Sequence, residues 1–103
     1  MDLVNVIGKV RFSSAKPQTI RLHKENELAL ELLCMEPGQE FKAPAGPRAY
    51  YVISGTARIT AQNGAAPQPL PAGQLAATYD GEEHILSNPS EQRLICLVIR
   101  GAS

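Results

Sequence analysis

Apolar and polar residues alternate along much of this chain, and this two-residue period is typical of β-strands with one buried face. In residues 18–23, Ile20 and Leu22 fall on one face and the polar residues fall on the other. We therefore predict a half-buried strand there, with the His23 side chain exposed to solvent rather than placed in a catalytic site.

The same reading predicts strands elsewhere in the chain. Residues 50–53, Tyr-Tyr-Val-Ile, are aromatic or β-branched, as strand residues commonly are. A Ser-Gly turn leads from them into residues 57–60, which alternate again, so we predict a β-hairpin over residues 50–60. Residues 93–100 hold six consecutive apolar residues between two arginines, which indicates a strand buried on both faces. Two further strands are expected at 75–78 and 83–87, on either side of a turn at residues 79–81.

Two segments fit more than one element. Residues 27–36 contain good helix formers at helical spacing, but the same leucines also alternate as in a strand. Because the flanking segments are strand-like, we predict a strand. Residues 2–12 form short apolar runs broken by Gly8, so we predict one or two strands with a kink or bulge at the glycine.

About ten short strands and no clear helix predict an all-β fold. The length of 103 residues fits a single domain over residues 1–103 and is sufficient to bury a hydrophobic core. A content of 44% hydrophobic and 19% charged residues is ordinary for a compact globular protein.

Charge and cysteine content exclude several classes of function. Ten basic residues balance ten acidic ones, so we expect neither nucleic acid nor a membrane as a partner. The chain has no signal-like start and no apolar run of the roughly 20 residues needed to cross a bilayer, so we expect a cytoplasmic location. Cys34 and Cys96 lie in apolar runs, and we expect buried free thiols rather than a disulfide or a metal site.

The spacing of residues between Gly73 and Asn88 is the most informative pattern. Five residues separate Gly73 from Tyr79, one separates Tyr79 from Gly81, two separate Gly81 from His84, and three separate His84 from Asn88. This pattern resembles the second conserved motif of the cupins, with Tyr79 where the family has proline.

The resemblance extends over residues 28–100. It implies a cupin-like antiparallel β-barrel, the double-stranded β-helix or jelly roll of the RmlC-like proteins. Cupins commonly pair as dimers, so the resemblance also implies a homodimer, with the N-terminal strand segment at residues 1–23 at the interface.

The first cupin motif is only partly present. Gly38 and Gly55 stand at its two glycine positions, but Pro44 and Gly46 stand at the two histidine positions and Arg48 stands at the glutamate position. Proline and glycine have no side-chain donor, and arginine stays protonated and cannot coordinate a cation. Three of the four metal ligands that the resemblance implies are therefore missing, and we predict no cofactor beyond weak binding of a divalent metal at the fourth.

The residue changes at this predicted site favour a small-molecule pocket. Arg48 replaces a carboxylate by a guanidinium, which binds carboxylates or phosphates through paired hydrogen bonds. Tyr50, Tyr79 and His84 would supply apolar walls and hydrogen-bonding groups. We therefore predict that these four residues bind a small, anionic molecule in the barrel mouth and that no residue is catalytic.

The sequence permits, but does not predict, metal-free catalysis by His84 with Tyr50 or Tyr79 as acid and base. Two further alternatives remain open from the sequence. In the first, the site is purely structural: Arg48 pairs with Glu40 or Glu82, and neighbouring groups satisfy the nitrogens of His84. In the second, the chain is a metal-dependent cupin enzyme of dioxygenase or isomerase type that uses an atypical ligand set around His84.

Overall fold

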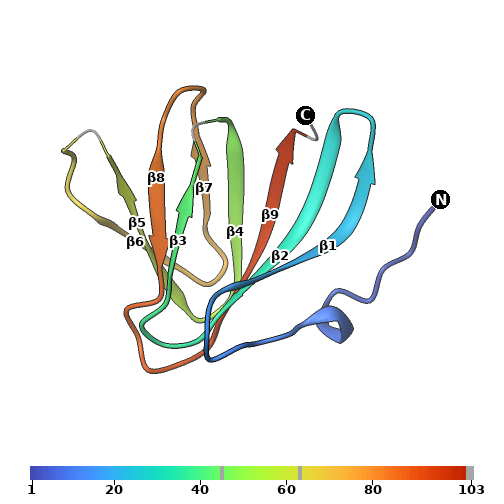
Figure 1. Cartoon of the computed structure of the whole chain (residues 1–103), viewed down its shortest axis with the longest axis horizontal. Coiled ribbons are helices and arrows are strands. Elements are labelled where there is room, and N and C mark those ends of the chain that lie inside the picture. Colours follow the sequence, from blue (N-terminus) through green and yellow to red (C-terminus); the bar gives the residue numbers. More distant parts are fainter. Residues whose placement is uncertain (45, 63, 102–103) are drawn as a thin grey trace.

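Two antiparallel sheets face each other across a common core (Figure 1). The computed structural model describes residues 1–44, 46–62 and 64–101, and within these residues it contains nine strands and one short 3-10 helix, η1 (Ile7–Lys9). The five-stranded sheet has the order β1 (Gln18–Glu25), β2 (Leu28–Met35), β9 (Leu94–Gly101), β4 (Arg48–Ser54) and β7 (Leu75–Thr78). The four-stranded sheet has the order β3 (Glu40–Ala43), β8 (His84–Ser87), β5 (Thr56–Ala61) and β6 (Gln68–Pro71). This arrangement confirms the prediction of an all-β, jelly-roll fold.

The core lies between the two sheets and is lined by every second residue of their strands. In the five-stranded sheet the register pairs Leu33 with Cys96, and Cys96 in turn with Val52. Their alternate neighbours consequently point to the outer face of the sheet. The buried cluster consists of Leu33, Met35, Tyr50, Val52, Ala57, Leu70, Leu86, Leu94, Cys96 and Val98.

The segment at residues 27–36 is strand β2, as predicted against its helix propensity. It lies between β1 and β9, and it pairs with β9 over its whole length and with β1 from Leu28 to Cys34. The ladder hydrogen bonds and the burial of its inner side chains outweigh an intrinsic preference that amounts to only tenths of a kcal/mol per residue. The strand at residues 18–23 is also confirmed, and it extends to Glu25.

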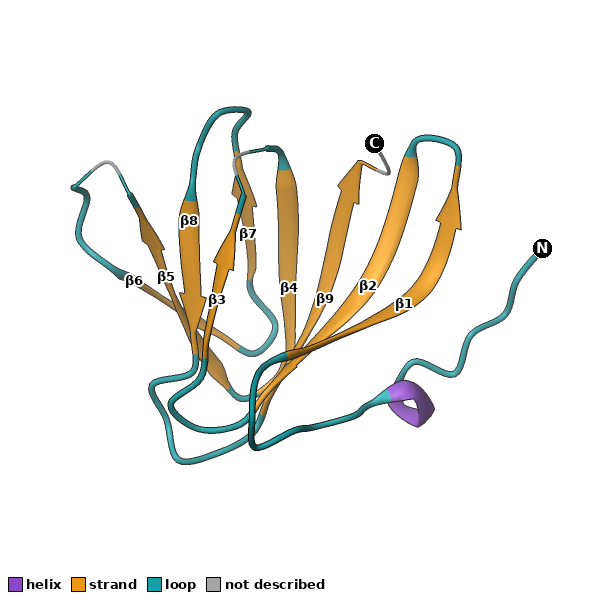
Figure 2. Ribbon diagram, viewed as in Figure 1, coloured by secondary structure: helices purple, strands orange, loops and turns teal. Residues whose placement is uncertain are grey.

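The predicted hairpin over residues 50–60 is wrong, although both of its strands exist. β4 pairs with β7 and β9, whereas β5 pairs with β6 and β8, so the two strands lie in different sheets. Gly55, at a φ of 91°, carries the chain from one sheet to the other. Figure 2 shows how the loops at this end of the barrel join strands of opposite sheets.

The predicted strands over residues 2–12 do not form. This segment pairs with neither sheet, and its only regular element is the single turn of η1. The side chain of Asn5 accepts a hydrogen bond from the Gly8 amide (3.2 Å), which favours a turn where the sequence pattern indicated a strand. In Figure 1 the segment runs beside β1 and its N-terminus extends away from the body of the molecule.

His23 is half-buried rather than fully exposed, which corrects the prediction. The register between β1 and β2 shifts between Arg21 and His23, and this bulge moves His23 onto the face that carries Ile20. There its Nδ1 atom lies 2.9 Å from the Asp2 carboxylate, which fixes the start of the N-terminal segment to β1.

The last strand, β9, is buried on its inner face only. Its outward side chains Ile95, Leu97 and Ile99 remain partly exposed, which corrects the prediction of burial on both faces. Cys34 and Cys96 are buried free thiols, as predicted. Among the described residues there is no helix of the length and apolarity needed to cross a membrane.

Candidate functional site

His84 is the first residue of β8 and points into the space between the sheets. Its cross-strand partners are Ala43 of β3 and Ala61 of β5, and the small size of both alanines leaves room for the imidazole. The side chain is almost completely buried, with 1% of its surface exposed. A polar ring at this depth needs hydrogen-bond partners from the protein.

Both nitrogens of His84 have such partners. Nδ1 lies 3.0 Å from the backbone oxygen of Glu82, and Nε2 lies 2.6 Å from the hydroxyl of Tyr50. A carbonyl oxygen only accepts hydrogen bonds, so Nδ1 carries a proton, while Nε2 shares its hydrogen bond with the phenol of Tyr50. Neither nitrogen of the imidazole is therefore free, which agrees with the structural alternative for this histidine.

Tyr50 reaches His84 from the opposite sheet. Its ring meets the imidazole edge to face, with 5.3 Å between the ring centroids. Burial raises the pKa of the Tyr50 phenol to about 12, although the nearby Arg48 guanidinium opposes this shift. The phenol consequently stays protonated near neutral pH and remains a donor to His84.

Arg48 begins β4 two residues before Tyr50 and shares its inward face. The guanidinium lies 5.9 Å from the centre of the Phe41 ring. The backbone amide of Arg48 donates to Thr78 Oγ1 (3.1 Å), which in turn donates to the carbonyl of Gly46 (3.2 Å) and fixes this end of the strand.

The two carboxylates proposed from sequence as partners of Arg48 do not pair with it. Among the described residues, no ion pair involves Arg48. The carboxylate of Glu82 instead accepts a hydrogen bond from the Tyr79 amide (3.1 Å), and Glu40 is an exposed residue of β3. The positive charge of Arg48 is thus not neutralised by either of them.

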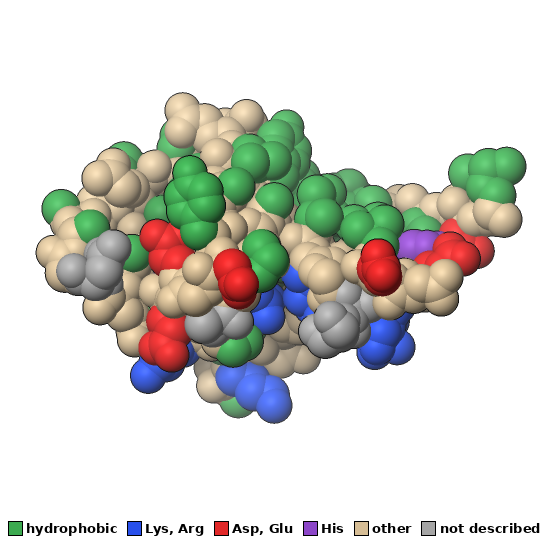
Figure 3. Space-filling model, turned by 90° about the horizontal axis from the view of Figure 1, so that it is seen from above, with side chains coloured by type: hydrophobic (Ala, Val, Ile, Leu, Met, Phe, Trp, Pro, Cys, Tyr) green, Lys and Arg blue, Asp and Glu red, His purple; other side chains and the backbone are tan. Residues whose placement is uncertain are grey.

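A second charged group lies beside Arg48. Arg100 is its cross-strand partner in β9 and binds Glu31 through two parallel hydrogen bonds of 2.9 and 3.1 Å. These bonds, together with the positive charges of Arg100, Arg48 and Arg21, hold the pKa of the Glu31 carboxyl below its usual value despite burial. One carboxylate therefore faces three guanidinium groups. In Figure 3, which views the barrel from this end, Lys and Arg side chains lie recessed near the centre.

Sequence reasoning missed the pair of Glu31 and Arg100. The two residues are 69 positions apart, and only the register between β2 and β9 brings them together. One signal was present, because a glutamate interrupts the run of leucines in residues 28–35 and an arginine ends the most apolar segment of the chain.

Tyr79 lies apart from the other three predicted residues. It is largely exposed in the loop between β7 and β8, where it borders an open hollow of about 430 Å³ together with Gln62 and the acidic residues of that loop. The structure thus brings Tyr50 and His84 into contact, places Arg48 beside them and leaves Tyr79 outside this group.

A smaller hollow of about 260 Å³ adjoins His84, between β7 and the hairpin of β5 and β6. Its walls are mostly alanine, and its polar lining consists of Gln68, Thr78, Glu82 and His84. Because both imidazole nitrogens are already bonded, His84 contributes mainly a ring edge to this hollow.

The residues at this site do not fit the divalent metal that the cupin resemblance implies. The positions of the other ligands hold Pro44, Gly46 and Arg48, and the hydroxyl of Tyr50 occupies the lone pair of His84 Nε2. Among the described residues, no group of three His, Cys, Asp or Glu side chains lies close enough to hold an ion. A metal at His84 would have to displace the bond from Tyr50.

Replacing Tyr50 by phenylalanine tests the importance of that bond. The variant leaves a buried imidazole nitrogen without a donor, so we expect the free energy of unfolding to fall by about 2 kcal/mol. Tyr51→Phe is the matched control, because this neighbouring side chain is partly exposed on the opposite face of β4, and we expect almost no change. Urea denaturation measures both. Equal losses in the two variants would contradict a stabilising role for the bond between Tyr50 and His84.

Comparison with solved protein structures identifies the fold of this chain. No protein-family model matches the chain, and no curated protein matches it significantly. Among solved structures, the TT1209 protein of Thermus thermophilus is 20% identical with a TM-score of 0.88, and the match covers 96% of this chain and 95% of that one. An uncharacterized conserved protein with a double-stranded β-helix domain from Klebsiella pneumoniae is 26% identical with a TM-score of 0.85, covering 96% and 88%.

A third solved structure carries a family name. It is an RmlC-like cupin protein of Desulfovibrio desulfuricans, 18% identical with a TM-score of 0.79, and the match covers 97% of this chain and 96% of that one. These matches confirm the resemblance stated from the two motifs, and they extend it over the N-terminal segment. The chain has the double-stranded β-helix fold of the RmlC-like cupins.

Proposed function

We propose that this cupin domain binds a small anion, such as a carboxylate or a phosphate ester, at the barrel mouth through Arg48. The observation that carries the proposal is that Arg48 is half-buried and its guanidinium forms no ion pair with any described residue. A charge held partly away from water is costly unless a counter-charge or hydrogen-bond acceptors approach it.

The neighbouring carboxylate, Glu31, supplies only part of that counter-charge. Glu31 accepts two hydrogen bonds from Arg100, and its single negative charge is shared among Arg100, Arg48 and Arg21. Three guanidinium groups act on this single carboxylate. The resulting positive surplus favours an anionic ligand over a neutral or cationic one.

The bond between Tyr50 and His84 favours binding without catalysis. A general base must be within reach of a substrate proton, and the acceptor nitrogen of His84 is already taken by a phenol whose pKa is about 12. The hydrogen-bonded pair of Tyr50 and His84 lies beside Arg48. A small ligand would rest against this pair with its anionic group on the guanidinium.

A thermal-shift titration tests the proposal. With acetate, malonate or inorganic phosphate as probes, we expect at least one to raise the Tm saturably, since a ligand at about 100 times its Kd stabilises the folded state by about 2.7 kcal/mol. Arg48→Gln should abolish the shift. Arg58→Gln is the control, because Arg58 is an exposed arginine of the other sheet, and it should leave the shift unchanged. A shift that survives Arg48→Gln, or no shift with any anion, would reject the proposed site.

A further inference from the structure

Strand β7 differs from the other edge strands in the described part of the chain, because its sequence contains neither a charged residue nor a proline. The edge strands are β1 and β7 in one sheet and β3 and β6 in the other, and Figure 2 shows β7 at the end of its sheet beside β4. Charged residues and prolines protect sheet edges from pairing with another chain. The strands β1 and β3 contain such charges and β6 contains two prolines, whereas β7 is Leu-Ala-Ala-Thr. The edge of β7 is therefore open to an added strand.

The free edge of β7 presents backbone hydrogen-bonding groups. The backbone amide of Val52 donates to the carbonyl of Gln74 (3.2 Å), which fixes the alternation of the ladder between β4 and β7. Since hydrogen-bonded and non-hydrogen-bonded pairs alternate in an antiparallel ladder, Leu75 and Ala77 belong to the pairs that exchange no hydrogen bonds with β4. Their N–H and C=O groups consequently point to the free edge. Both residues are exposed.

A small apolar hollow lies along this edge. It is the hollow of about 260 Å³ beside His84, and its lining includes Ala76 and Ala77 of β7 together with Ala61 and Gln68 of the β5–β6 hairpin. A strand added to β7 would lie about 4.8 Å from it and would direct every second side chain towards this hollow. The alanine walls favour small apolar side chains there.

The loop that follows β7 is acidic. Asp80, Glu82 and Glu83 border the open hollow of about 430 Å³ together with the exposed Tyr79. Glu82 also lines the smaller hollow, so the two hollows adjoin. No ion pair between described residues involves these three carboxylates. They favour a basic side chain at the end of the added strand that lies beside them.

We propose that β7 is the docking edge for an extended peptide segment of another protein, which adds to the five-stranded sheet as an antiparallel strand. Strand addition takes its affinity from main-chain hydrogen bonds and its specificity from alternate side chains. In antiparallel pairing the N-terminal end of the peptide lies beside the C-terminal end of β7, where the acidic loop begins. The recognised segment therefore starts with basic residues and continues with a small residue at every second position.

Charge complementarity favours such a segment over a second copy of this chain. In an antiparallel pair of two β7 strands, residues 71–74 of each copy would lie beside the acidic loop of the other. These residues are Pro-Ala-Gly-Gln and include no basic side chain. The inference is independent of the anion site, because Arg48 does not line the hollow beside β7.

A peptide titration followed by fluorescence anisotropy tests the proposal on the full chain. The probe is a labelled Arg-Lys-Val-Ala-Val-Ala-Thr amide, and we expect saturable binding with a Kd below about 1 mM. The two valines would pair with Ala77 and Leu75, so N-methylation of both valine amides should raise the Kd about 10-fold or more. N-methylation of both alanine amides is the control, since these amides point away from β7, and it should change the Kd much less.

Ala77→Pro is the corresponding change in the protein. It removes the N–H group at the free edge without removing a bond to β4, so we expect an intact fold by circular dichroism and a Kd raised about 10-fold or more. Ala72→Pro is the control, because Ala72 lies in the turn closed by the Gln74 amide on the Pro71 carbonyl (3.1 Å), where proline is accommodated. Arg48→Gln should also leave the Kd unchanged, which separates this edge from the anion site.

Three results would overturn the proposal. They are the absence of saturable peptide binding, a Kd that valine N-methylation or Ala77→Pro leaves unchanged, and a wild-type dimer in light scattering that Ala77→Pro converts to monomers. The last result would assign the edge of β7 to a second copy of the chain.

Discussion

Replacing Gly55 by alanine is expected to lower the free energy of unfolding by about 4 kcal/mol, because a steric clash and an unfavourable backbone conformation act together. The added Cβ would lie 2.6 Å from the carbonyl oxygen of Arg93 and 3.2 Å from the Cα of Leu94. Both are backbone atoms and cannot rotate away. The φ of +91° adds strain of its own, because residues with a Cβ rarely adopt it.

Gly73→Ala is the control that separates these two causes. Gly73 has nearly the same φ, +86°, but an added Cβ would meet no atom within 4 Å. We expect only the conformational cost there, about 1–2 kcal/mol. Urea denaturation of both variants gives the difference, which measures the close approach of the two segments. Equal losses would show that the clash at Gly55 is relieved by a backbone shift.

The position of Gly55 explains why the hairpin prediction failed. A Ser-Gly pair between two alternating segments fits a tight hairpin and a crossing between sheets equally well in sequence. The choice is made by Arg93 and Leu94, which pack against Gly55 from a distant part of the chain. Local turn chemistry does not contain that information.

Periodicity predicted the elements that have one buried and one exposed face. It identified β1, where the half-buried Ile20 lies between the exposed Thr19 and Arg21. Most of β2 is buried on both faces, and there the strand-like flanking segments decided the prediction. It failed for residues 2–12, where Val4 and Val6 are half-buried and line a hollow with residues of the sheet but do not join its hydrogen-bond ladder. Alternation of apolar and polar residues indicates that every second side chain is buried. A segment can bury these side chains without pairing with a strand.

The site was predictable in part for a similar reason. Strand parity in residues 48–50 places Arg48 and Tyr50 on one face, and the motif spacing places His84 inside the barrel. The bond between Tyr50 and His84 depends on the distance between the two sheets, which no local pattern encodes. That bond decides the chemistry of the site, because it uses the nitrogen that a metal would need.

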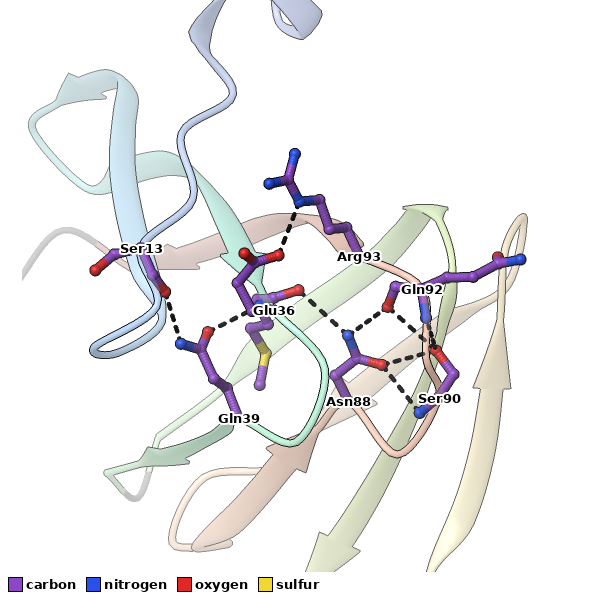
Figure 4. Close-up of polar contacts among 8 residues, drawn as sticks. Ser13, Glu36, Gln39, Asn88, Ser90, Gln92 and Arg93 are labelled. Atoms are coloured by element: carbon purple, nitrogen blue, oxygen red, sulfur yellow. Dashed lines mark hydrogen bonds and ion pairs between the residues drawn. The ribbon is translucent and has the colours of Figure 1, made fainter.

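Asn88, the last residue of the second motif, has a structural role at the closed end of the barrel (Figure 4). Its side-chain nitrogen donates to the carbonyls of Met35 (3.2 Å) and Gln92 (2.7 Å), and its side-chain oxygen accepts from the amide (3.2 Å) and hydroxyl (2.9 Å) of Ser90. The backbone of Asn88 also pairs with Gly38 and Gln39. The residue is 1% exposed, so all of its hydrogen-bonding capacity is used inside the protein.

Asn88→Asp is therefore expected to cost about 3 kcal/mol at neutral pH despite the near-identical shape of the two side chains. The new carboxylate oxygen would face two carbonyl oxygens where the amide donated two hydrogen bonds. Burial and these carbonyls raise the pKa of the new carboxyl above its value in the unfolded chain, although the bonds from Ser90 partly oppose this.

The sign of the pH dependence follows from that shift. Because the folded pKa is the higher one, the variant is least destabilised below about pH 4, where the unfolded carboxyl is also protonated, and its loss of stability grows as the pH rises. A protonated carboxyl can donate to one of the two carbonyls, which restores one of the lost bonds. Thermal melts of the wild type and the variant across this range measure the difference, with the exposed Asn5→Asp as a control that should show little change. A loss that is independent of pH would mean that the carboxylate escapes to solvent and that the bonds from Asn88 do not hold this end of the barrel.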